Sequence, residues 1–340
     1  MNGDSRHQSV DSYYGYSALK PPVWTWEVPA YFFIGGAAGA AALIAAVARR
    51  TGARSDLVRD ARWIAAAGAA LSPPLLISDL GRPERFLNML RVFKLRSPMS
   101  VGAWTLVAFS NAASAAAFAE LAHRATAGRL PVRVIADAAG VLSAATGLVL
   151  STYTGVLLGA TAIPAWSRNA RLLPLHFGAS GLGSAVSILE LMGHHDRALN
   201  RIGIGAALIE TAIGAHIELS DSTKFQALNQ GRPLSLVRAA GVLSGPVPLL
   251  LRALTGRSRR ARQIAALSTI AGSMLTRLAW VSAGRSSARS SSQAIATNSP
   301  RATGAAADRL DASFFTASSM VDGNTLEKQS RSSDSPAGSA

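Results

Sequence analysis

Eight long apolar runs restrict the folds open to this chain more than any other feature of the sequence. They lie at approximately 28–48, 62–79, 98–121, 134–161, 172–192, 200–219, 234–253 and 261–283. A helix needs about 20 apolar residues to cross the roughly 30 Å hydrocarbon core of a bilayer, and each run meets or approaches that length. The sequence therefore predicts an all-α, polytopic integral membrane protein with eight transmembrane helices.

Charge and cysteine content narrow the functions that such a protein can have. The formal net charge is +15, but most Lys and Arg residues lie in short segments between the apolar runs, as membrane-flanking residues do. Nucleic acid is therefore not an expected partner. The chain has no cysteine, which excludes thiolate-bound iron–sulfur clusters and c-type haem. We expect no metal site, no haem and no iron–sulfur cluster in this chain.

The segments outside the apolar runs suggest three regions. Residues 1–27 form a polar leader that ends in interfacial aromatic residues, and it lacks a signal-peptide pattern, so we expect the first run to be kept as a helix. Residues 28–284 form the membrane domain. Residues 285–340 are rich in Ser, Ala and Gly without hydrophobic periodicity, which predicts a disordered tail. Eight spans place both termini on one side, here called side A, and the opposite face is side B.

Several polar side chains are predicted to lie at one level near side A. Ionisable groups inside membrane spans are costly and are therefore often functional. The groups near side A are Glu27, Asp79, Tyr153, His176, His216, Glu218 and Arg277. Glu210 lies near the middle of the membrane, where we expect a functional or helix-pairing role. By contrast, Glu120, Asp137 and Glu190 lie near side B, where solvated carboxylates are ordinary.

These residues leave several interpretations open. His176 and His216 fit either interfacial histidines or the axial ligands of one b-type haem. Trp24, Trp26 and Tyr31 fit either an aromatic belt or a surface that stacks on a ring-shaped ligand. Arg277 is expected to pair with a carboxylate such as Asp79 or Glu218, because an unpaired buried guanidinium is costly.

Polar side chains near side A, surrounded by apolar residues of the spans, suit a quinone, which has an amphipathic ring and a long isoprenoid tail. A phenol or an imidazole would hydrogen-bond the ring oxygens, and a titratable group would accept protons as electrons leave. The candidate catalytic residues are Asp79, Tyr153, Glu27, His176 and His216, with Trp24 and Trp26 beside the ring and Glu210, Arg277 and Glu218 as a proton relay. Without cysteine or a haem pair in the chain, the electrons must pass to a cluster in another protein on side A.

The stretch DLGRPERFLNML follows the second apolar run directly. Asp79 ends that helix, and Gly81 and Pro83 suit an exit turn. Apolar residues then recur at helical spacing, which predicts a helix over 84–94 that lies in the membrane interface and roofs the pocket. Its basic residues are Arg82, Arg85, Arg91 and Lys94. They are expected to contact either lipid head groups or a docked partner.

Four motifs resemble the NrfD/PsrC family of membrane subunits of molybdenum oxidoreductases: KPPVWTWEVPAYFFIGGAAGA, DLGRPERFLNMLRVFKLRSPMSVGAW, TYTGVLLGATAIPAW and GSMLTRLAWVSAGRSSA. The resemblance covers roughly residues 13–290. It implies a haem-free anchor of eight helices that reacts with menaquinone or ubiquinone, and we expect two four-helix bundles. Tyr153 matches the family's quinone-contacting tyrosine, Trp24 to Glu27 match the segment beside that pocket, and Asp79 matches the loop carboxylate.

The resemblance also implies partners and a location. The partners would be a four-cluster ferredoxin-like iron–sulfur subunit and a molybdopterin catalytic subunit. The location would be the cytoplasmic membrane, with side A and both termini extracytoplasmic. Basic residues are nearly equal in number on the two sides, so the positive-inside rule alone leaves this orientation open.

An alternative function is a proton- or ion-coupled transporter. It is suggested by Glu210 and by prolines expected to kink the second and seventh helices, Pro73-Pro74 and Pro246/Pro248. The two halves of the sequence show no matching pair of interrupted spans, which such a transporter would be expected to have. The leading prediction is therefore a quinone-reactive membrane subunit of an oxidoreductase complex, with proton translocation as a possible addition.

Overall fold

The computed structural model describes residues 22–82, 84–126, 132–220, 232–255 and 258–298. The chain divides into two compact units, one of residues 19–291 and one of residues 1–18 with 292–340. Only 292–298 of the second unit are described, as helical backbone, so most of the predicted leader and tail lie outside the described residues. All regular structure that is described is helical, as the sequence predicts.

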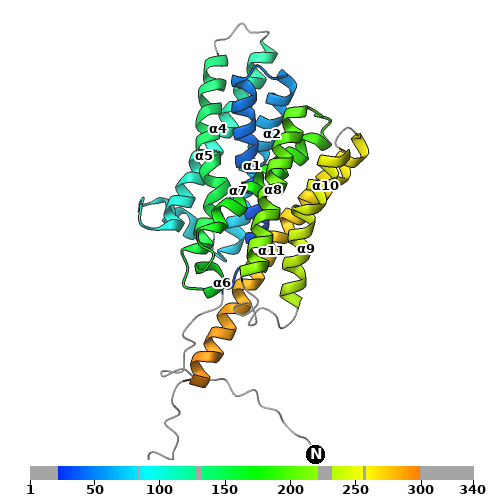
Figure 1. The fold of residues 1–340 in the computed structure, drawn as a ribbon. Helices are drawn as coiled ribbons and strands as arrows, with labels where there is room; N and C mark the ends of the chain where they lie inside the picture. Colours follow the sequence, from blue (N-terminus) through cyan, green and yellow to red (C-terminus); the bar gives the residue numbers. More distant parts are fainter. Residues whose placement is uncertain (1–21, 83, 127–131, 221–231, 256–257, 299–340) are drawn as a thin grey trace, which may run out of the picture. The chain divides into compact units, whose positions relative to one another are not determined.

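Figure 1 shows the helices of the larger unit, most of them running side by side. In chain order they are α1 (Glu27–Arg50), α2 (Ser55–Asp79), α3 (Glu84–Leu90), α4 (Pro98–Ala125), α5 (Val132–Gly159), α6 (Pro164–Ser167), α7 (Leu172–Leu191), α8 (Arg197–Ser220), α9 (Arg232–Ser244), α10 (Pro246–Thr255) and α11 (Arg259–Asn298). Within the described residues, seven spans are long and apolar enough to cross a membrane, with α9 and α10 together forming one of them. The count is eight if α2 and α3, bent by 113°, are one span. The chain is therefore a multi-pass membrane protein.

The helices pack in an order that brings α7 to the centre of the unit. Helices α1, α2, α4 and α5 contact one another in a ring, and α7 packs against α1, α5 and α8. Helix α8 also contacts α9 and α10. Helix α11 reaches α9 through the Ser268 hydroxyl, which donates to the Leu243 carbonyl at 2.7 Å. The division into two four-helix bundles stays a prediction.

Glycines allow α1 to approach α5 and α7 closely. A Cβ atom at Gly39 would lie 2.3 Å from the carbonyl oxygen of Gly147 on α5. A Cβ atom at Gly181 on α7 would lie 2.8 Å from the carbonyl oxygen of Gly36. Both distances are too short for any side chain, so backbone packs directly on backbone. This is the close packing that small residues permit between membrane helices.

The prolines in the second and seventh spans affect the helices differently. Helix α2 continues through Pro73 and Pro74, and the Ser110 hydroxyl of α4 donates to the Ala69 carbonyl, which would otherwise receive the missing Pro73 amide. In the seventh span, α9 ends at Ser244 and Pro246 begins α10. The first proline pair is thus accommodated inside a helix, whereas Pro246 marks a break.

The charged stretch after α2 forms a shorter helix than predicted. Helix α3 ends at Leu90 rather than at residue 94. The Ser100 hydroxyl donates to the Val92 carbonyl at 3.2 Å and accepts the Lys94 amide at 3.0 Å, so these backbone groups are bonded outside a helix. Helix α3 has no buried residue and packs against α4. At the other end of the chain, α11 continues to Asn298, past residue 285 where the sequence predicts the tail to begin.

Candidate functional site

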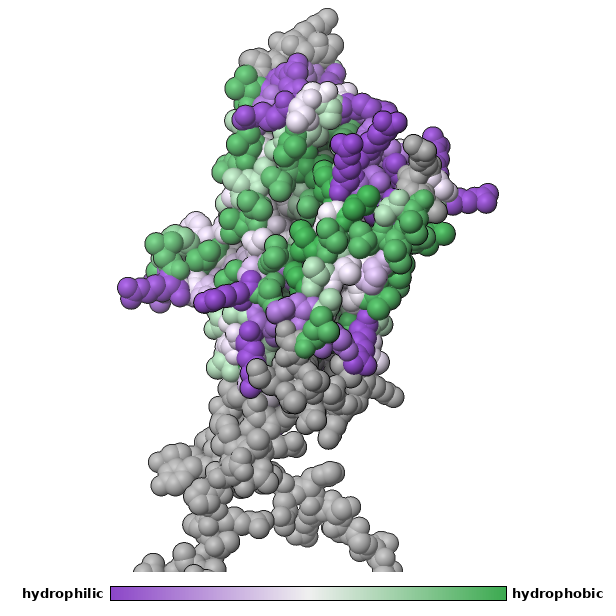
Figure 2. All heavy atoms as spheres, in the orientation of Figure 1, coloured by the Kyte–Doolittle hydropathy of each residue, from purple (hydrophilic) through white to green (hydrophobic). Residues whose placement is uncertain are grey.

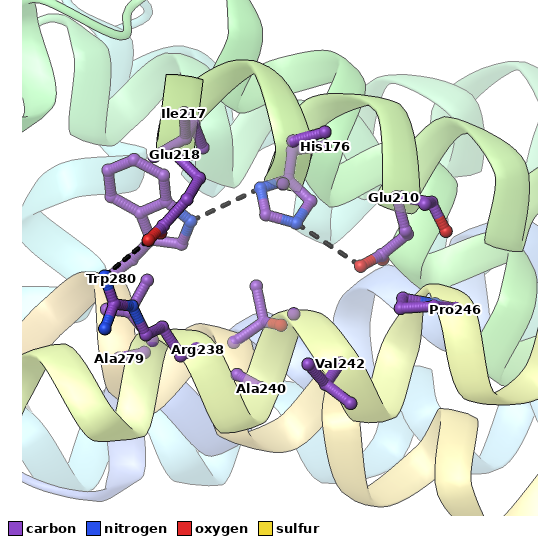
Figure 3. A pocket seen from close by; sticks show the side chains of 16 residues that line it. His176, Glu210, Ile217, Glu218, Arg238, Ala240, Val242, Pro246, Ala279 and Trp280 are labelled. Carbon is purple, nitrogen blue, oxygen red and sulfur yellow. Dashed lines mark hydrogen bonds and ion pairs between the residues drawn. The ribbon is translucent and has the colours of Figure 1, made fainter. Parts of the chain in front are cut away.

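A cavity of about 360 Å³ lies between α7, α8, α9, α10 and α11, near side A (Figure 3). Its walls are mostly apolar, with Ile217, Val237, Val242 and Pro246 among the lining residues. The polar side chains in the lining are His176, Glu210, Thr211, Glu218, Arg238, Thr276 and Trp280. The cavity therefore combines an apolar interior with a few polar groups, as small-molecule sites do.

His176 has a hydrogen-bonding partner at each ring nitrogen. The indole Nε1 of Trp280 donates to Nδ1 at 3.3 Å, and Nε2 lies 3.3 Å from the Glu210 carboxylate (Figure 3). Because an indole N–H only donates, Nδ1 must accept, which places the proton on Nε2, facing Glu210. The imidazole is thus fixed as a donor toward a carboxylate.

Glu210 is buried in the middle of its span with its two oxygens in different environments. Its Oε2 atom accepts hydrogen bonds from His176 and from the Ser244 hydroxyl. Ser244 is the last residue of α9, so the break before Pro246 helps to place this hydroxyl. Oε1 is buried and has no partner among the described residues. A buried polar atom without a partner indicates a place for a ligand or a water molecule.

The outer part of the cavity carries an ion pair between two helices. Glu218 near the end of α8 pairs with Arg238 of α9 (Figure 3). Both side chains are more than half exposed, at 53% and 57%. Because exposed ion pairs contribute little to stability, this pair can open at small cost. Glu218, one of the predicted relay residues, thus lies at the exposed edge of the cavity.

Arg277 lies behind the cavity wall, and its predicted pairing with Asp79 or Glu218 is wrong. Its guanidinium is fully buried and donates to the hydroxyls of Ser180 and Ser273 and to the carbonyl of Phe177. The guanidinium carbon lies 4.7 Å from the centre of the Phe177 ring. Neutral oxygen acceptors and a cation–π contact therefore make the direct contacts of this guanidinium, while the carboxylate whose charge acts on it is Glu210, not Asp79 or Glu218.

Asp79 and the residues before α1 form a separate cluster. The backbone amide and the hydroxyl of Thr25 both donate to Asp79 Oδ1 at 3.1 Å, and the hydroxyl also contacts Glu27. Trp24 stacks on Trp166 of α6, with ring centres 5.3 Å apart and planes 12° apart. Asp79 thereby joins the end of α2 to the beginning of α1.

Two other predicted aromatic residues lie elsewhere. Trp26 is 64% exposed and projects from the packed helices. Tyr31 is buried at 3% exposure in the core, so it does not belong to an exposed aromatic belt. The prediction that Tyr31 belongs to an interfacial aromatic belt is therefore wrong.

Tyr153 packs between α5 and α4 rather than in the cavity. Its hydroxyl donates to the Pro98 carbonyl at 2.6 Å, and its ring fills the space that a side chain at Gly102 would need. The residue is 6% exposed. In this arrangement the phenol joins α5 to the beginning of α4.

The two predicted histidines do not share a site. His216 is exposed on α8 and does not line the cavity, whereas both ring nitrogens of His176 are engaged by protein groups. This arrangement does not suit a haem held between the two. Across the described part of the chain, no cluster of three or more His, Asp or Glu side chains suits a metal ion.

The four basic residues predicted to dock a partner are all exposed. Arg82 precedes α3, Arg85 lies on it, and Arg91 and Lys94 follow it. No residue of α3 lines the cavity, so the predicted lid does not cover this site.

Three tryptophans in successive contact, Trp24, Trp166 and Trp280, connect the Asp79 cluster to the cavity. Trp166 is fully buried, and its indole N–H donates to the Trp280 carbonyl at 2.7 Å. Trp24 stacks on one side of this connection, and His176 accepts from Trp280 on the other. Sequence reasoning assigned no role to Trp166 or Trp280, although both belong to the quoted motifs TAIPAW and TRLAW.

A buried ion pair lies near side B, where the sequence predicted a solvated carboxylate. Glu190 of α7 is 1% exposed and lies 2.8 Å from Arg252 of α10, which also donates to the Ser187 hydroxyl at 3.3 Å. The expectation of a solvated Glu190 is wrong because α10 covers it. Between this pair and His176, α7 presents a row of buried serines: Ser180, Ser184 and Ser187.

Comparison with known proteins adds the following findings. The sequence model of a family described as "Polysulfide reductase" (NrfD_2) matches residues 11–290, which include α1 to α10 and most of α11. No protein with a curated description matches the chain.

Proposed function

The chain belongs to the NrfD-like polysulfide reductase family, and from that premise we propose that it is the quinone-reactive membrane subunit of a multi-subunit oxidoreductase. The family makes it a membrane subunit that works with redox subunits. The proposal adds that the cavity between α7, α8, α9, α10 and α11 takes the quinone ring.

The cavity fits such a ligand in size and in chemistry. Its volume of about 360 Å³ lies within the range of small-molecule sites. Apolar side chains such as Val237 and Val242 suit a ring and the first part of an isoprenoid tail. The free Oε1 of buried Glu210 supplies a polar atom that still needs a partner.

The protein groups would hold the ring and take its protons. A quinol supplies two electrons and two protons when it is oxidised. Glu210 would accept one of these protons at Oε1, while the His176 N–H and the Ser244 hydroxyl keep Oε2 in place. Glu218 at the exposed edge of the cavity would accept the other proton, and both electrons would pass to the partner subunit. The Trp280 N–H fixes the tautomer of His176 during this step. The apolar walls would exclude water, which strengthens these interactions.

The observation that carries the proposal is the buried His176–Glu210 pair in an otherwise apolar cavity. An ionisable residue inside a membrane span is costly, so its placement beside a cavity supports a functional role. The lack of cysteine means that electrons leave for a partner subunit. We propose a four-cluster ferredoxin-like subunit on side A, followed by a molybdopterin subunit, with side A outside the cytoplasmic membrane.

Quinone-analogue binding by the purified chain tests this proposal. Glu210→Gln and His176→Gln should each weaken saturable binding by about tenfold or more, equivalent to one lost hydrogen bond to a charged group. His216→Gln is the matched control, because this histidine is exposed on α8 and does not line the cavity. Equal affinity in all three variants would show that the quinone site lies elsewhere.

A second candidate function, proton movement across the membrane, is supported by the polar row on α7. Ser180 donates to Ser273 at 2.8 Å, Ser184 donates to the Ser180 carbonyl at 2.8 Å, and Ser187 accepts from Arg252. The row extends from the level of Glu210 to the Glu190–Arg252 pair. Replacing Ser184 by Ala should then reduce dye-detected proton uptake in liposomes while quinol oxidation continues. Unchanged uptake would exclude this path.

A further inference from the structure

A second cavity lies at the side B end of the molecule, away from the His176–Glu210 site. Its volume is about 560 Å³. The lining residues come from α1, α2 and α5: Ala46, Arg49, Arg50, Arg62, Val134, Asp137, Ala138, Gly140 and Val141. Figure 2 shows hydrophilic side chains gathered over this end, above a band of hydrophobic ones.

The cavity has a positively charged side. Arg49 binds Asp137 through two nitrogens at 2.9 and 3.0 Å, and Arg62 bridges Asp137 and Glu120. Arg50 has no acidic partner among the residues described. Counting Arg124, which pairs with Glu120, the group has four arginines and two carboxylates, so two positive charges remain.

The buried Arg62 side chain distinguishes this cavity from a group of exposed surface charges. The side chain is 4% exposed, yet it lines the cavity, and its Nε is buried without a partner in the described structure. A Cβ atom at Gly140 would lie only 3.1 Å from one guanidinium nitrogen, so the glycine leaves room for it. The ion pairs with Asp137 and Glu120 then hold the guanidinium in place beside the cavity.

The opposite wall is apolar and exposed. Val134 is 73% exposed and Val141 is 48% exposed, and Ala138 lies between them on the same helix. On a membrane helix, exposed apolar side chains of this kind face hydrocarbon. The cavity thus joins a cationic side to a hydrocarbon-facing side where a span leaves the bilayer core.

We propose that this cavity binds an anionic phospholipid, with its phosphate at Arg50 and Arg62 and its acyl chains along Val134 and Val141. Arginine guanidinium groups match phosphate geometry, and basic pockets between membrane helices bind anionic head groups. A free phosphate ion shares the head-group chemistry but makes no use of the apolar wall. The site is independent of the quinone proposal, because none of its residues lines the first cavity.

Lipid titration of the delipidated full-length chain in mild detergent tests the proposal. Native mass spectrometry would measure retention of phosphatidylglycerol, phosphatidylcholine as a zwitterionic control, and inorganic phosphate. Phosphatidylglycerol should bind more tightly than phosphatidylcholine, and Arg50→Gln should weaken its binding about fivefold, as expected for one arginine. Arg201→Gln is the control, an exposed arginine at the same end that does not line the cavity.

A second variant separates the lipid from the free ion. Ala138→Leu leaves the charges unchanged but narrows the apolar side, so it should weaken phosphatidylglycerol binding only. Equal retention of the two lipids, or equal effects of the Arg50 and Arg201 changes, would overturn the proposal. Inorganic phosphate that competes fully with phosphatidylglycerol, with no effect of Ala138→Leu, would show an anion site instead of a lipid site.

Discussion

Removing the carboxylate of Glu190 should destabilise the protein more than removing the whole Glu190–Arg252 pair. Both side chains are within 1% of complete burial, and their charged atoms are 2.8 Å apart. The Arg252 guanidinium is also confined, because a Cβ atom at Gly203 would lie 2.6 Å from it. After Glu190→Leu, the arginine would keep its charge, and the Ser187 hydroxyl would be its one remaining side-chain partner in the described part of the chain.

The size of this effect follows from the cost of a buried unpaired charge. Breaking one partner of a buried pair costs about 3–5 kcal/mol, whereas replacing both partners by apolar residues is often nearly neutral. At roughly 2–4 °C per kcal/mol for a chain of this size, Glu190→Leu should lower the Tm by on the order of 10 °C. The double variant with Arg252→Met should recover most of that loss.

Thermal unfolding in detergent, followed by tryptophan fluorescence, would measure all four proteins of this double-mutant cycle. Two-state behaviour should be checked at several heating rates. Single and double variants with the same Tm would show that Arg252 finds other partners or reaches water. The reasoning about the buried pair would then be refuted.

Two further variants test other contacts. Tyr153→Phe removes the hydrogen bond to the Pro98 carbonyl and should lower the free energy of unfolding by about 1 kcal/mol, as measured by thermal unfolding. The affinity for a quinone analogue should stay unchanged. A large loss of affinity would instead place the quinone at Tyr153, as the family resemblance implies. Gly284→Ala would place a Cβ atom 2.1 Å from the Trp166 ring, so the Tm should fall and the tryptophan emission should shift; an unchanged spectrum would contradict this packing.

The sequence predicted the helical spans well because their signal is local. Each of the eight apolar runs matches an observed helix or helix pair, with ends that differ by a few residues except that α2 begins earlier, at Ser55, and α11 continues to Asn298. Length and hydropathy are enough for this, since a bilayer leaves few other choices for an apolar run. Helix α3 ends before residue 94 because Ser100 bonds the backbone groups of Val92 and Lys94. Ser100 lies outside residues 84–94, so the periodicity of that segment could not reveal this contact.

The candidate site could be predicted only in part because it depends on which helices become neighbours. The sequence indicated Glu210 and His176 by their depth, and the structure brings these two together. Depth alone could not separate His176 from Asp79 or Tyr153, which were predicted at the same level but lie on other helices. It also placed Glu210 deeper than His176, although the two side chains are in contact. Trp280 was missed because tryptophan in a span is ordinarily apolar filling, and its donor role depends on facing His176.

The glycine contacts of α1 bear on the transporter alternative. Alternating access requires one group of helices to rock or slide against another around a central site. A slide of α7 by one helical turn would bring Phe177 or Ala185 to the place of Gly181, where a Cβ atom would lie 2.8 Å from the carbonyl oxygen of Gly36 on α1. The backbone contacts of α1 therefore prevent α5 and α7 from sliding along it. A protein held in this way is suited to passing electrons and protons through fixed groups rather than to carrying a solute across the membrane.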